Sequence, residues 1–104
     1  MKQQEFNNLL EDFTLEMLGY DVTDYEKRYF WRHFQVVISG LNLDLSAAWD
    51  LEEMVHYDPV KILRFRNVMA SQGNEMTIRQ AEIWMVMLEI ALIEIGFYEW
   101  EKKE

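Results

Sequence analysis

The sequence predicts an all-α protein, a compact bundle of four to five helices with a long central helix near its C-terminal end, at about residues 77–102. Apolar residues recur at steps of three and four along most of the chain, as they do on one face of a helix. The chain has one proline and four glycines, and the glycines stand where such segments should end. Half of the residues are apolar and none is cysteine, so the core must form without disulfides. At 104 residues we expect a single helical domain, 1–104.

The first helix is predicted from one apolar face near the N-terminus. Its members are Phe6, Leu9, Leu10, Phe13, Met17 and Leu18. Their spacing places them on one side of a helix, and Gly19 marks its end.

A capping box predicts the start of the second helix. In the segment TDYE, the Thr23 hydroxyl can accept a hydrogen bond from the Glu26 amide, and the Glu26 carboxylate can accept one from the Thr23 amide. An apolar stripe follows, so this helix should run from about Asp24 to Ser39 and end at Gly40.

Residues 41–57 form the least regular part of the sequence. The letters LNLDL alternate as in a strand, but five residues without a partner strand cannot form a stable sheet. We therefore expect a loop over 41–45 that packs its leucines inward. A short helix should follow, from about Ser46 to Tyr57.

The last two helices have clear start signals. Asp58 followed by Pro59 is typical of an N-cap and the first helical position, and the segment SQGN should end that helix. Thr77 and Gln80 form a second capping box, which opens the C-terminal helix.

The C-terminal helix should run from Ile78 to about Lys102, and its side chains are apolar on nearly every face. Its roughly 25 residues would extend for about 37 Å, slightly more than the expected diameter of the domain. A membrane span is disfavoured because Glu82, Glu89 and Glu94 would each be costly inside a bilayer. The helix is therefore either a core helix wrapped by the others or a helix that keeps one face for a partner, as in a homodimer.

The charge of the chain favours binding to a protein over binding to nucleic acid or a membrane. The net charge is −9, and residues 41–58 contain five carboxylates and no lysine or arginine. An acidic chain is a poor ligand for phosphates, but it can bind a basic protein surface. We therefore predict a non-enzymatic protein–protein interaction module. The candidate contact residues are Asp44, Asp50, Glu52, Glu53, Asp58, Trp84, Met87, Tyr98 and Trp100.

In size and composition the chain resembles small, acidic, mostly helical proteins by which phages inhibit host nucleic-acid machinery. No motif carries this resemblance, so it assigns no role to any residue. It implies a phage or mobile-element inhibitor that binds a basic, nucleic-acid-binding surface of a host protein. The alternative for residues 41–58 is a solvated acidic surface that only keeps an apolar chain in solution.

A dimeric helix-turn-helix regulator is the alternative function. Helices at about 59–71 and 77–90, joined by the glycine-containing turn SQGNEM, match its outline. The second helix, however, has one cation and places tryptophan and methionine where base-reading side chains belong. The candidate DNA-contacting cations are Lys61, Arg64, Arg66 and Arg79.

No catalytic, cofactor-binding or metal site is predicted, so we do not expect an enzyme. Glu53 and His56 have the E-x-x-H spacing of di-iron bundles, but the second such motif is missing. The acidic helices also resemble in outline the all-α nucleotide pyrophosphohydrolases, which bind magnesium through E-x-x-E and E-x-x-D pairs. Glu52, Glu53, Glu82 and Glu89 form no such pair in their segments. A carboxylate-metal enzyme therefore ranks below the other two functions.

The N-terminal residues bear on location. The segment MKQQEFNNLLEDF lacks the basic end and unbroken apolar run of a signal peptide, so we expect a cytoplasmic protein.

Overall fold

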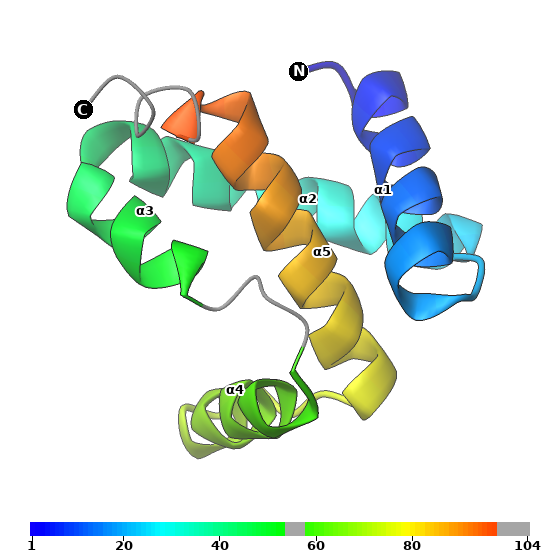
Figure 1. Ribbon diagram of the computed structural model, residues 1–104, viewed down its shortest axis with the longest axis vertical. Helices are drawn as coiled ribbons and strands as arrows, with labels where there is room; N and C mark the ends of the chain where they lie inside the picture. Colours follow the sequence, from blue (N-terminus) through cyan, green and yellow to red (C-terminus); the bar gives the residue numbers. More distant parts are fainter. Residues whose placement is uncertain (54–57, 98–104) are drawn as a thin grey trace.

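The computed structural model describes residues 1–53 and 58–97, and within these residues it contains helices and no strands (Figure 1). The all-α prediction is therefore confirmed. The helices are α1 (Gln3–Leu18), α2 (Asp24–Leu43), α3 (Leu45–Glu52), α4 (Pro59–Ser71) and α5 (Ile78–Glu94).

The residues predicted to cap the starts of α2, α4 and α5 are the N-caps in the structure. The Thr23 hydroxyl accepts from the Glu26 amide at 3.1 Å, and the Glu26 carboxylate accepts from the Thr23 amide at 2.8 Å. Thr77 and Gln80 form the same reciprocal pair at the start of α5. The carboxylate of Asp58 caps α4, with proline at the first turn. Each of these starts is set by side chains within a few residues of it, and all three predictions are confirmed.

The predicted end of α2 and the predicted loop after it were wrong. The helix continues through Gly40 to Leu43, and Asp44 alone separates it from α3. Leu41 is buried against the core, and this packing outweighs the roughly 1 kcal/mol that a glycine costs inside a helix. α3 ends at Glu52, short of the predicted end near Tyr57: Glu53 is already its C-cap, and residues 54–57 lie outside the described residues.

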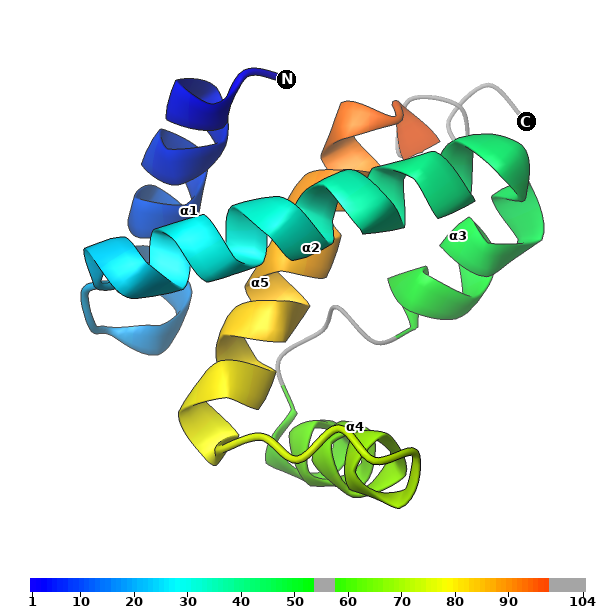
Figure 2. The same ribbon diagram turned by 180° about the vertical axis from the view of Figure 1, so that it is seen from behind.

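Helix α5 is the centre of the bundle, as predicted. It packs against each of the other four helices, which lie around it on different sides (Figure 1, Figure 2). This explains why its sequence is apolar on nearly every face. Its buried residues are Ala81, Ile83, Trp84, Met85, Val86, Met87, Leu88, Ile90, Ala91 and Leu92.

The predicted length of the last helix was wrong. α5 ends at Glu94, and Gly96 follows with a φ of 74°, in the left-handed region that ends many helices. Its 17 residues extend for about 26 Å. The described fold measures 36 × 31 × 23 Å, so α5 lies within it. Residues 98–104 lie outside the described part of the chain.

Helix α4 is held differently from the others. α1 and α2 pack against each other as well as against α5, whereas α4 packs extensively against α5 alone within the described residues. In both views α4 stands apart from α1, α2 and α3 (Figure 1, Figure 2). Ile62 is its one buried residue.

None of the helices in the described residues has the length and apolarity that crossing a membrane requires.

Candidate functional site

A groove lies where α4 and the C-terminal end of α3 meet α5. Its volume is about 660 Å³. The apolar residues that line it come from two helices: Ile62, Phe65 and Val68 from α4, and Ala81, Met85 and Leu88 from α5.

The spacing of these residues explains the floor of the groove. Ala81, Met85 and Leu88 follow one another at four and three residues, so they lie along one face of α5. Ile62 and Phe65, three residues apart, form the facing side of α4. Ile62, Ala81 and Met85 pack together in a small apolar cluster of their own, separate from the main core. The floor is therefore a small contact between α4 and α5 that is separate from the main core, with residues at the end of α3 on its border.

Charged residues of opposite sign border this floor. Glu52 and Glu53 approach from α3, while Lys61 and Arg64 approach from α4. The Lys61 ammonium donates to the main-chain carbonyl of Glu53 at 2.9 Å and so connects the two sides. Among the described residues, the side chains of Glu52, Glu53 and Arg64 form no ion pair. The groove thus has one acidic wall and one basic wall, both with side chains available for binding.

The apolar surface continues from the groove onto the outside of α4. Val60 is 55% exposed and Val68 is 53% exposed, although both belong to a helix that also packs on the core side. A smaller hollow of about 220 Å³ lies on the other flank of the same helix. It is lined by Pro59, Ile62, Leu63, Ile78 and Glu82.

Of the five carboxylates predicted to bind a partner, the groove brings together two, Glu52 and Glu53. Asp44 and Asp58 instead serve as helix caps for α3 and α4. Asp50 is exposed on α3 and does not line the groove.

Asp44 shows how such a cap works. Its carboxylate accepts from the Ser46 amide at 3.0 Å and from the Ser46 hydroxyl at 2.6 Å. These hydrogen bonds lower the pKa of Asp44 because they stabilise the charged form, and the bond from the Ser46 hydroxyl has the largest effect. The carboxylate therefore has a local structural role at the start of α3.

Two of the aromatic and methionine residues predicted to contact a partner, Trp84 and Met87, do not lie on the surface. Met87 is fully buried, and Trp84 is 8% exposed and packs against the rings of Phe30 and His33. Tyr98 and Trp100 lie outside the described residues. The large apolar residues of α5 that are exposed are Ile78 and Ile93, near its two ends. The face that a homodimer through α5 would need is therefore covered within one chain.

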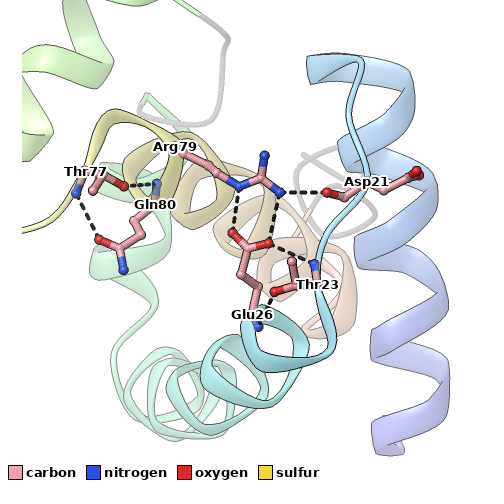
Figure 3. A network of polar contacts seen from close by, with 6 residues as sticks. All are labelled: Asp21, Thr23, Glu26, Thr77, Arg79 and Gln80. Carbon is pink, nitrogen blue, oxygen red and sulfur yellow. Dashed lines mark hydrogen bonds and ion pairs between the residues drawn. The ribbon is translucent and has the colours of Figure 1, made fainter.

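The four cationic residues predicted to contact DNA in the helix-turn-helix alternative lie in three different environments. Lys61 and Arg64 border the groove, and Arg66 is partly buried on α4. Arg79, at the start of α5, donates to the Glu26 carboxylate at 2.8 and 3.0 Å (Figure 3). The same guanidinium donates to the carbonyl of Asp21 at 2.7 Å, as Figure 3 also shows. Arg79 is thus engaged by its own chain.

The pKa of Glu26 is lowered, chiefly by its hydrogen bonds to the Arg79 side chain. Arg79 in turn has a raised pKa, also chiefly because of Glu26. Its guanidinium lies 4.2 Å from the centre of the Tyr20 ring as well. These contacts connect the starts of α2 and α5. Arg79 would have to break them in order to bind a phosphate.

The described residues contain no group of three or more histidine, aspartate or glutamate side chains that could bind a metal ion. Glu53 of the E-x-x-H spacing lies at the groove, whereas His56 lies outside the described residues. The other histidine, His33, packs between the rings of Tyr29 and Trp84. Its burial lowers its pKa below the ordinary value.

Comparison with models of protein families, with curated proteins and with solved structures found no match for this chain.

The sequence did not single out the apolar floor of the groove. Phe65, Met85 and Leu88 have the spacing of a core face, and nothing in that spacing distinguishes a groove from an interior. One signal was available: α4 has apolar residues on several sides of a short helix that also contains three cations. A helix with apolar residues on more than its core face favours a second contact surface.

Proposed function

We propose that the chain is a non-enzymatic protein–protein interaction module that binds its partner at the groove between α3, α4 and α5. The observation that supports this proposal is an apolar floor bordered by charged side chains of both signs. Protein interfaces have this anatomy, with an apolar centre and a polar, solvent-accessible rim.

The groove suits a protein better than a small molecule. Its volume falls within the range of small-molecule sites, but such sites also contain a few converging polar groups that orient the ligand. Here the charged groups stand at the two walls, and the apolar surface extends beyond the groove to Val60 and Leu63 on the outside of α4. An extended surface of this kind is covered more completely by a protein than by a compact ligand.

The net charge of −9 favours a partner with a basic surface, because opposite charges speed the encounter of two proteins. An inhibitor that occupies a basic, nucleic-acid-binding surface of a host protein is the narrower form of the proposal, and it rests on size and charge. The regulator alternative is disfavoured, because Arg79 is held by Glu26 and the residues of α5 that would read bases are buried.

Site-specific photocrosslinking tests the proposal. A photoreactive benzophenone amino acid replaces Val68, which lines the groove, and in a matched variant it replaces Val36, which is 72% exposed on α2. Each variant is irradiated in a lysate of the cells that produce the protein. We expect covalent adducts with a protein from position 68 and none from position 36. Absence of adducts at position 68, or equal adducts at both positions, would contradict the proposal.

A further inference from the structure

We infer that the protein that occupies the groove is a second copy of this chain, with α4 of each copy lying in the groove of the other. This inference rests on the proposed function, since it names the partner at the same site. The second copy has the same net charge of −9, so the contact depends on the opposite charges of the two groove walls and not on an overall basic partner. Three features of α4 and the groove lead to it: an exposed stripe on α4 that runs along the edge of the groove, the opposite charges of the two walls, and the packing of α4 against a single neighbouring helix.

The stripe consists of Val60, Arg64 and Val68, which are four residues apart and therefore share one face of α4. All three are exposed. If two such helices pack antiparallel about a two-fold axis near Arg64, Val60 of each copy meets Val68 of the other. The two-fold symmetry forms this contact twice. The stripe of one copy is therefore covered by the same stripe of the other copy.

The charges fit the same arrangement. A two-fold axis near Arg64 brings the two guanidinium groups toward each other, and they would repel unless each is paired with a carboxylate. The acidic wall supplies that carboxylate: Glu52 lines the groove opposite Arg64 and has no ion pair among the described residues. In the dimer, Arg64 of each copy pairs with Glu52 of the other. A groove with one acidic and one basic wall is self-complementary in this way, whereas a groove of a single sign would repel its own copy.

The area that a stable dimer requires indicates which part of α4 the second copy has to cover. A stable interface buries about 800 Å² on each partner, which is roughly an eighth of the chain's accessible surface of 6563 Å². The groove alone does not provide this area, so the contact includes the part of α4 beyond the groove, where Val60 lies. The second copy would then cover the one helix that, among the described elements, packs extensively against a single neighbour.

Sedimentation equilibrium of the full chain, from low to high micromolar concentration, is the first test. We expect a dimer that dissociates on dilution. Val68→Glu should raise the dissociation constant at least about tenfold, because it places a carboxylate in the apolar contact. Val36→Glu, at an exposed valine on α2, is the matched control and should leave the dissociation constant unchanged. Circular dichroism checks that each variant remains helical.

A charge exchange between copies tests the Arg64–Glu52 pairing itself. Glu52→Lys alone and Arg64→Glu alone should each be monomeric, since every inter-copy pair then joins like charges. An equimolar mixture of the two variants should form a heterodimer, because both pairs are again opposite in sign. A charge contact within one chain could not be restored by mixing, so recovery of the dimer in the mixture identifies the contact as one between copies.

Two outcomes would overturn the inference: a wild-type chain that stays monomeric at high micromolar concentration, or a mixture that does not recover the dimer. The photocrosslinking experiment separates this failure from failure of the proposed function. Adducts from position 68 to a different protein would leave the interaction module intact and exclude the second copy, whereas no adduct at all would contradict both.

Discussion

Arg79 and Glu26, which are 53 residues apart in the sequence, join the first turn of α5 to the first turn of α2 through two hydrogen bonds of 2.8 and 3.0 Å. The same carboxylate accepts from the amide of Thr23 in the capping box of α2. Glu26 therefore serves a local and a tertiary role at once, and the start of α2 is positioned relative to the central helix by one side chain.

Removing the guanidinium should destabilise the fold modestly. Arg79→Met keeps the aliphatic part of the side chain but loses the hydrogen bonds to Glu26 and to the carbonyl of Asp21. We expect the free energy of unfolding to fall by about 1 kcal/mol, a small value because the Arg79 side chain is 42% exposed. Chemical denaturation measures this change. Arg32→Met is the control, since Arg32 is exposed and has no ion pair among the described residues, and an equal loss there would contradict the assigned role.

His33 should make stability depend on pH near neutrality. Burial lowers its pKa from the ordinary value of 6.5, so the folded state binds a proton less readily than the unfolded chain. Its contribution to stability is therefore fully present above pH 6.5, and it decreases as the pH falls below 6.5 toward the folded-state pKa. NMR titration of the His33 ring should give a midpoint below 6.5, and His33→Gln should flatten the stability curve in this range. The lowered pKa of Glu26 acts at more acidic pH, because its ordinary value is 4.5.

Truncation of the central helix should be far more costly inside than at its end. Met87 is fully buried, so Met87→Ala leaves a cavity and should cost about 2–5 kcal/mol. Ile93 is on the same helix but 43% exposed, so Ile93→Ala should cost well under half as much. Thermal or chemical unfolding of the two variants measures the difference. Similar losses at both positions would contradict the central placement of α5.

Two glycines should respond in opposite directions to alanine. Gly40 lies within α2 and a Cβ there would meet nothing within 4 Å, so Gly40→Ala should stabilise by about 0.5–1 kcal/mol. Gly96 also has open space around it, but its φ of 74° is strained for alanine. Gly96→Ala should therefore destabilise by about 1 kcal/mol. Unfolding curves test both, and a loss of stability at Gly40 would show that α2 does not continue through that residue.

The sequence predicted the parts of the fold that depend on neighbouring residues. The starts of α2, α4 and α5 follow from Thr23, Asp58 and Thr77, whose side chains satisfy amides only two or three residues away. The end of α5 was missed although Gly96, in the left-handed region, is a local signal for it, whereas the end of α2 depends on a contact far along the chain. Leu41 extends α2 past a glycine through its burial in the core, and no local pattern reports that contact.

The candidate site was less predictable than the fold. Glu52 and Glu53 were identified as binding residues from charge, but Asp44 and Asp58, which have the same charge, are helix caps. The groove exists because α4 crosses α5 at a distance from α3, and that orientation is set by tertiary packing. The apolar floor therefore has the same sequence pattern as the core beside it.

The central position of α5 also has a consequence for how the chain acquires its structure during synthesis. Helices α1 to α4 precede α5 in the chain, yet each packs its apolar face against it. A ribosome therefore releases four amphipathic segments before it releases the element that buries them. Until α5 emerges, these segments have no common core, and their apolar faces are open to chaperones or to one another. Cooperative folding should begin only once residues 78–94 are free, so the last described helix determines when all the others become stable.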